Sequence, residues 1–207
     1  LASSLIITLG AMVVSVVLSS LLAFIFARVD FRGRAIWFNI LMIGLLFPLG
    51  VAILPLFIQL RLLNLVDSYW GVILPIAIFA APANTVILTN FFSQIPGELE
   101  DASYIDGCSR FDFFRYILLP LARPAITAVA TLAVVLSWNE FLLPLIVLND
   151  PTKWPLPLGV MQFQGQFGTD WARVMAFIML LIIPAVVFYI FAEKYIVTGL
   201  TGGELKG

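Results

Sequence analysis

The sequence predicts an all-α protein, a polytopic bundle of transmembrane helices, on two observations. Of its 207 residues, 62% are hydrophobic and 11% are charged, whereas soluble globular chains are about 45–50% apolar and about 25% charged. The apolar residues also gather in long stretches without charge, and a helix needs about 20 mostly apolar residues to cross a bilayer. A soluble domain of this length could not bury so much apolar surface, so a soluble fold is excluded.

Five stretches are long and apolar enough to be membrane spans. The predicted spans cover residues 4–27, 36–60, 69–92, 124–148 and 171–195. The second and third each hold two prolines and are expected to be kinked, because neighbouring groups in a membrane protein can satisfy the carbonyls that proline frees. We therefore expect a single transmembrane domain over residues 1–207.

Lysine and arginine predict how the domain is oriented. With five spans, eight of the eleven Lys and Arg residues fall on one side, and Arg61, Lys153 and Arg173 fall on the other. Basic residues are enriched on the cytoplasmic side of membrane proteins. We expect segment 93–123 and the tail, residues 196–207, in the cytoplasm, and loop 149–170 outside.

Composition also excludes several kinds of site. The chain has one cysteine and no histidine, which rules out an intrachain disulfide and removes the commonest metal ligand and general base. It has no run of basic residues, so no nucleic-acid partner is expected. No glycine-rich Lys-Ser/Thr loop is present, so the chain is not itself an ATPase. We expect a non-catalytic membrane subunit that binds neither cofactor nor metal.

Segment 93–123 is the only sizeable polar segment, and it predicts two helices joined by a tight turn. Acids at positions 98, 100 and 101 favour the start of a helix, and Gly107 favours a left-handed residue at its end. Ser109 and Asp112 are spaced as a capping box for the second helix, which is expected to end at Leu119-Pro120. This second helix is rich in aromatic residues, and an exposed apolar patch outside the membrane usually marks a docking surface.

The spacing of this segment resembles the EAA motif, the coupling loop of ATP-binding-cassette (ABC) importer permeases. The family pattern is Glu-Ala-Ala, three residues, Gly, nine residues, Ile, one residue and Leu-Pro. The chain has Asp101-Ala102-Ser103, Gly107, Ile117 and Leu119-Pro120 at that spacing. Asp replaces Glu and Ser replaces the second Ala, which leaves open whether Asp101 or Glu100 makes the main polar contact. The alternative interpretation is an ordinary loop between two helices.

The resemblance implies that this helix pair docks in a cleft of a separate ATPase subunit. ATP binding, with Mg in that partner, would close two ATPase subunits on each other and move the loops. The residues implied in coupling are Glu98, Glu100, Asp101, Ala102, Ser103, Asp106, Gly107, Phe111, Phe114, Ile117, Leu119 and Pro120. The implied partners are a second permease subunit, two ATPase subunits, membrane lipid and an extracytoplasmic substrate-binding protein, which loop 149–170 would contact.

Other parts of the chain resemble the maltose-type carbohydrate branch of these permeases. The similar strings lie at residues 32–34, 138–145 and 198–203. The resemblance implies a type I importer permease in the inner membrane of a bacterium, which takes up a sugar or sugar-like solute by binding-protein-dependent transport. Such subunits usually have six spans, so a further N-terminal span is expected to precede Leu1.

Trp138, Asn139 and Glu140 are candidates for the substrate path. Glu140 is the one acid predicted well inside a span, and a charge there costs about 2.5–3.5 kcal/mol unless it faces a cavity or a partner. Asn139 and Glu140 would then hydrogen-bond sugar hydroxyls, and Trp138 would offer a stacking face. Equally, these polar residues would hold helices or subunits together.

Three other functions stay open at this point. The chain could be an importer permease for a non-sugar solute, an ion-driven secondary transporter or a membrane scaffold without a path. An ion-driven transporter needs acids or histidines within the membrane, and only Glu140 qualifies.

Overall fold

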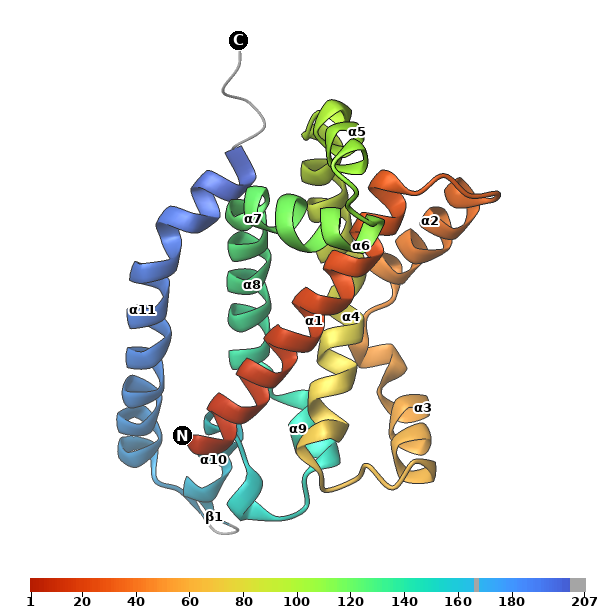
Figure 1. Cartoon of the computed structure of the whole chain (residues 1–207). Helices are drawn as coiled ribbons and strands as arrows, with labels where there is room; N and C mark the ends of the chain where they lie inside the picture. Colours follow the sequence, from red (N-terminus) through yellow and green to blue (C-terminus); the bar gives the residue numbers. More distant parts are fainter. Residues whose placement is uncertain (166–167, 202–207) are drawn as a thin grey trace.

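Long helices run side by side through the computed structural model, with a helical hairpin at one end and a looped segment at the other (Figure 1). The structure describes the backbone of residues 1–165 and 168–201, and the side chains of residues 1–163, 170–184, 186, 187 and 190. The long helices are α1 (Ala2–Arg28), α4 (Tyr69–Gln94), α8 (Arg123–Trp138) and α11 (Trp171–Thr201). Helix α1 packs along both α4 and α8, and α11 packs on α8.

The predicted second span is a bent pair of helices. It consists of α2 (Arg34–Ile43), the short 3-10 helix η1 (Gly44–Leu46) and α3 (Leu49–Leu62), and the two halves meet at 103°. Phe47 and Pro48 have extended backbones there, because proline disfavours the helical conformation of the residue before it. The kink expected in the span over residues 36–60 is therefore found at Phe47 and Pro48, where it separates two helices. Helices α3 and α4, by contrast, continue through their internal prolines.

The predicted fourth span is also interrupted. Helix α8 ends at Trp138, and the short helix α9 (Leu142–Val147) begins four residues later. Over the described residues, two helices are long and apolar enough to cross a membrane, or up to four if each bent pair counts as one span. The count of five spans stays a prediction.

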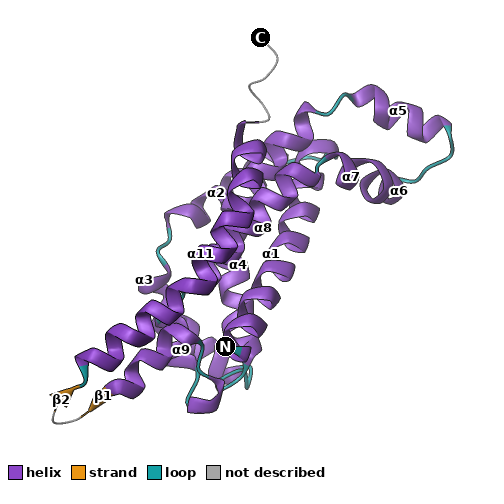
Figure 2. Cartoon of the chain, turned by 90° about the vertical axis from the view of Figure 1, so that its left-hand side faces the viewer, coloured by secondary structure: helices purple, strands orange, loops and turns teal. Residues whose placement is uncertain are grey.

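Loop 149–170 holds short elements that close one end of the bundle. They are η3 (Pro151–Lys153), α10 (Leu156–Gly159), η4 (Val160–Phe163), β1 (Gln164–Gly165) and β2 (Gly168–Thr169). The two strands are antiparallel, with Gln164 opposite Thr169, and form a small projection (Figure 2). Apart from these short strands, the regular elements described are helical, as predicted for an all-α fold.

Helix α1 buries mostly small and polar residues, together with Ile7 and Phe26, and exposes most of its large apolar ones. The buried face includes Ser3, Ser4, Thr8, Ala11, Ser15, Ser19, Ser20 and Ala23, whereas Leu5, Leu9, Val13, Val17, Leu21 and Ile25 are exposed. Small residues let two backbones approach closely, which is how helices in a membrane pack. In the seam with α4, the Asn84 amide donates a 2.8 Å hydrogen bond to the Ser15 hydroxyl.

An aspartate clasp, formed by Asp67 and Lys153, joins the two loops at the end opposite the hairpin. Asp67 has a left-handed backbone (φ 57°), and its carboxylate accepts the backbone N–H groups of Asn149 and Asp150, each at 3.1 Å. Lys153 Nζ lies 2.7 Å from the same carboxylate and also donates to the Asp67 carbonyl. The hydrogen bond from Lys153, followed by those from the backbone, lowers the pKa of Asp67.

We predict that Gly71→Ala destabilises the protein, because the first turn of α4 has no room for a Cβ atom. A Cβ atom there would lie 2.2 Å from the Leu65 carbonyl oxygen, a backbone atom. Overpacking of this kind costs about 1–3 kcal/mol, so the thermal unfolding midpoint in detergent should fall. The control is Gly50→Ala, where nothing lies within 4 Å. Equal midpoints for the two variants would contradict the described packing.

We also predict that the aspartate clasp weakens in acid. A carboxylate whose pKa is lowered by folding stabilises the folded state above its ordinary pKa of about 4, and this contribution disappears as the pH falls through the lower, folded value. The unfolding midpoints of the wild type and Asp67→Asn should therefore differ more at pH 6 than at pH 3. A difference that does not change with pH would show that the clasp contributes no pH-dependent stability.

Candidate docking hairpin and substrate path

Two local features of the sequence, a left-handed glycine and a capping box, determine the shape of the hairpin. Its first arm is α5 (Gly97–Ile105), and Gly107 (φ 85°) makes the turn in the left-handed conformation. The second arm starts with α6 (Arg110–Asp112), where the Ser109 hydroxyl accepts the Asp112 N–H at 3.2 Å and the Asp112 carboxylate accepts the Ser109 N–H at 3.0 Å. The Ser109 hydroxyl also donates to the Asp112 carboxylate, and this hydrogen bond, followed by the one from the Ser109 N–H, lowers the pKa of Asp112. Both the turn and the capping box are confirmed.

The second arm continues further than the sequence predicted. After α6 come a single π-helical segment, η2 (Phe113–Leu118), and α7 (Leu119–Leu121). The last helical residue is Leu121, one residue after the expected end at Leu119-Pro120. The helical path breaks at Ala122, where it bends by 79° into α8.

One face of the hairpin is anchored in the bundle. Phe113 is fully buried and Phe114 is 6% exposed, and the Phe114 ring centroid lies 4.9 Å from that of Phe24 in α1. Ser103 is buried as well, and its hydroxyl donates to the Glu100 carbonyl at 2.7 Å. Of the residues predicted to meet a partner, Phe114 and Ser103 therefore pack inside this chain.

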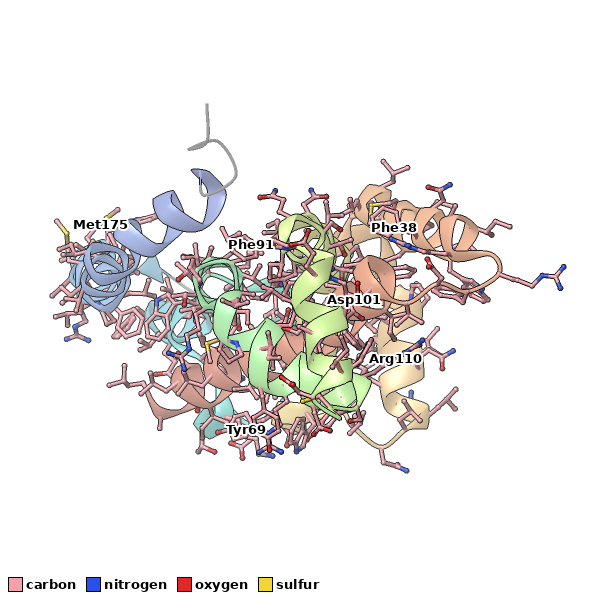
Figure 3. The ribbon with its side chains drawn as sticks, turned by 45° about the horizontal axis from the view of Figure 1, so that its top comes forward. Phe38, Tyr69, Phe91, Asp101, Arg110 and Met175 are labelled. Atoms are coloured by element: carbon pink, nitrogen blue, oxygen red, sulfur yellow. The ribbon has the colours of Figure 1, made fainter. Side chains whose placement is uncertain are left out.

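The other face of the hairpin carries exposed apolar and acidic side chains. Ile105 is 87% exposed, Phe111 60% and Tyr116 64%. Two of the predicted coupling residues, Ile117 and Leu119, are half-buried. Six others are exposed, namely Glu98, Asp101, Ala102, Asp106, Gly107 and Pro120. Figure 3 looks onto this end, with Asp101 on α5 and Arg110 on α6 labelled. Sequence reasoning missed Ile105, although it lies one helical turn after Asp101.

The structure separates the two acids between which the motif left the choice open. Glu100 turns inward, where one carboxylate oxygen lies 3.6 Å from Arg28 Nη1 and the other accepts the Tyr104 hydroxyl at 2.6 Å. Burial, and then the Glu100 carboxylate, raise the pKa of Tyr104. Asp101 is exposed, and among the described residues it makes no side-chain hydrogen bond or ion pair.

The candidate path residues lie at the break after α8. Trp138 and Asn139 line a groove of about 640 Å³ between α1, α8 and α11, whose wall is mostly apolar. The Asn139 amide donates to the Val135 carbonyl at 2.7 Å, and its side chain is exposed. Trp138 is 8% exposed, and its indole N–H is buried without a partner among the described residues.

Glu140 does not share this groove. Its carboxylate accepts the Leu143 N–H at 3.1 Å and so caps the start of α9, a local contact within the same stretch of chain. The structure thus brings Trp138 and Asn139 to one surface and gives Glu140 a structural contact.

Comparison with known proteins identifies the family. The family model described as "binding-protein-dependent transport system inner membrane component" matches residues 2–200. A trehalose/maltose transport system permease of Thermococcus litoralis is 36% identical over 209 residues, covering 100% of this chain and 75% of that protein. An arabinooligosaccharide transport system permease of Bacillus subtilis is 35% identical over 205 residues, covering 99% of this chain and 72% of that protein.

A sulfoquinovosyl glycerol transport system permease of Agrobacterium fabrum is 34% identical over 205 residues, covering 99% of this chain and 72% of that protein. Both the family model and these relatives extend over the hairpin, α8 and the groove, so the similarity is not confined to one motif. The chain belongs to the family of binding-protein-dependent transport system inner membrane components, the ABC importer permeases that its hairpin spacing resembles.

Proposed function

We propose that this chain is a permease subunit that forms part of the membrane path for a sugar or sugar-like solute and docks an ATPase through the α5–α7 hairpin. The relatives reported above are named for the transport of trehalose and maltose, arabinooligosaccharides and sulfoquinovosyl glycerol. All of these solutes carry sugar units with many hydroxyl groups. This shared chemistry supports a carbohydrate rather than an unrelated solute.

The observation that carries the docking proposal is the exposed apolar side chains of the hairpin. Ile105 and Phe111 lie on an otherwise polar segment, between the acidic helix α5 and the start of α6. Leaving such side chains in water forfeits about 1.5–3 kcal/mol each relative to burial, so a partner surface that covers them would gain that energy. We assign the outward polar contact to Asp101, because Glu100 is occupied by Arg28.

The proposed assembly and topology follow from the same family. A second permease, two ATPase subunits that hold ATP and Mg, and an extracytoplasmic binding protein would complete the importer. The hairpin and the C-terminal tail, whose residues 202–207 lie outside the described residues, would face the cytoplasm. The five spans would be α1, the α2–α3 pair, α4, α8 with α9, and α11, with a sixth before Leu1.

We predict that the double variant Ile105→Ser/Phe111→Ser loses its ATPase. From native membranes in mild detergent, the wild type should copurify with an ATPase subunit and a second membrane subunit. The double variant should keep the membrane subunit, but the amount of copurified ATPase should fall by about tenfold or more, because two apolar contacts would be removed. Replacing the whole hairpin would be a poorer test, because it would also delete the buried residues Phe113 and Phe114.

The matched control for this experiment is Leu63→Ser, which changes another exposed apolar residue, 64% accessible and directly after α3, at the end of the molecule opposite the hairpin. Full retention of the ATPase by the double variant would show that this face is not the docking surface. A wild type that purifies alone and well folded would remove the docking role and favour an ion-driven transporter.

We predict that Asn139→Leu reduces solute uptake without affecting assembly. The exposed amide borders the groove, and the loss of one hydrogen bond to a sugar hydroxyl is expected to weaken transport by about 3–10-fold. The probes are radiolabelled maltose, trehalose and arabinotriose, and the control is Asn39→Leu, an exposed asparagine in α2. Glu140→Leu would be ambiguous, because it also uncaps α9. Unchanged uptake by Asn139→Leu would support the scaffold alternative.

A further inference from the structure

Arg28 is a charged residue that the fold buries at the junction of three helices. It is the last residue of α1, and its side chain is only 9% exposed. One terminal nitrogen, Nη2, donates to the Phe92 carbonyl at 2.6 Å and to the Ile95 carbonyl. The other, Nη1, lies 3.6 Å from the carboxylate of Glu100, which is itself 15% exposed.

The contacts to Phe92 and Ile95 stabilise the end of α4. That helix ends at Gln94, and the last carbonyls of a helix have no intrahelical donor and form the negative end of its dipole. A guanidinium group offers five N–H donors in a fixed plane, so it can serve two carbonyls and a carboxylate at once. A lysine ammonium at the same position keeps the charge but lacks this forked geometry.

The contact to Glu100 connects the docking helix with the long helices. Among the described residues, it is the one ion pair between α5 and any of the long helices α1, α4, α8 and α11. Glu100 is held on its other side by the Tyr104 hydroxyl at 2.6 Å, so its carboxylate has a fixed position. The pair is shielded from solvent, whereas a nearby surface pair, Asp30 with Arg34, is 101% and 40% exposed and so contributes little.

On the basis of the proposed docking of the hairpin, we infer that Arg28 is a positioning residue that transmits movement of α5 to α1 and α4. When a partner pulls on α5, Glu100 moves with it, and the guanidinium carries the displacement to the last turn of α1 and to the carbonyls that end α4. The helix pair then moves as one body, because α1 and α4 are packed along their length. The aromatic anchor at Phe113 and Phe114 holds the second arm, so this ion pair is the polar link of the first arm.

The test uses the full importer complex in lipid nanodiscs and hydrogen exchange read by mass spectrometry. Exchange is compared without nucleotide and with ADP and vanadate, which trap the closed ATPase. In the wild type, nucleotide should alter exchange in α5 and in residues 24–28 and 88–94. In Glu100→Gln, which leaves the contacts of Arg28 to α4 in place, the α5 change should persist. The change in the long helices should shrink about fivefold or more, the lower end of typical coupling between sites.

Arg28→Lys is the second variant, and Arg34→Lys and Asp30→Asn are the matched controls from the exposed pair. A purely structural role of Arg28 would alter exchange with and without nucleotide alike, so the nucleotide-dependent difference is the decisive quantity. The inference is overturned if Glu100→Gln shows the same nucleotide-dependent change of exchange in the long helices as the wild type. It is also overturned if the variant loses the change in α5 while the ATPase remains bound. If the wild type retains no ATPase, the proposed docking itself fails, and the inference fails with it.

Discussion

The packing of α1 on α4 is the constraint on which the rest of the structure depends. Small side chains bring the two backbones so close that a Cβ atom at Gly10 would lie 2.7 Å from the Ile73 side chain. Both ends of the molecule are tied to this pair. At one end the Ser4 hydroxyl accepts the Leu156 N–H at 2.7 Å, and at the other Arg28 binds the end of α4. Helix α1 is thus the element to which both looped ends are attached.

The hairpin shows how one short segment can serve two environments. Its buried aromatic residues belong to the same core cluster as Phe92 and Ala23, and its exposed residues form the opposite face. A partner docked on the exposed face as proposed would push on side chains that are backed by packed core. Protein interiors are packed as densely as organic crystals, so such a push would displace neighbouring helices rather than be absorbed locally.

Local signals were enough to predict the fold class and the hairpin turn. The left-handed Gly107 and the capping box of Ser109 and Asp112 depend only on residues a few positions apart, and both are found in the structure. Apolar composition likewise indicated helices in a membrane. Contacts between distant residues were not accessible in this way: Glu100 turns inward because Arg28, 72 positions earlier, lies beside it.

The same distinction explains why the second and fourth predicted spans are not single helices. Several prolines lie within the apolar stretches, and the sequence does not say which one breaks a helix. The break is at Pro48, where the preceding residue is extended, whereas α4 continues through Pro75 and Pro82. Hydrophobicity alone also joined α8 to α9, although Glu140 caps a separate helix there.

The order of synthesis limits when the aspartate clasp can form. Asp67 and Lys153 are 86 residues apart, so a growing chain has completed α1, α4 and α8 before the ribosome adds the lysine. Until then, the Asp67 carboxylate has no lysine with which to pair. The clasp therefore forms only after these three helices have been synthesised.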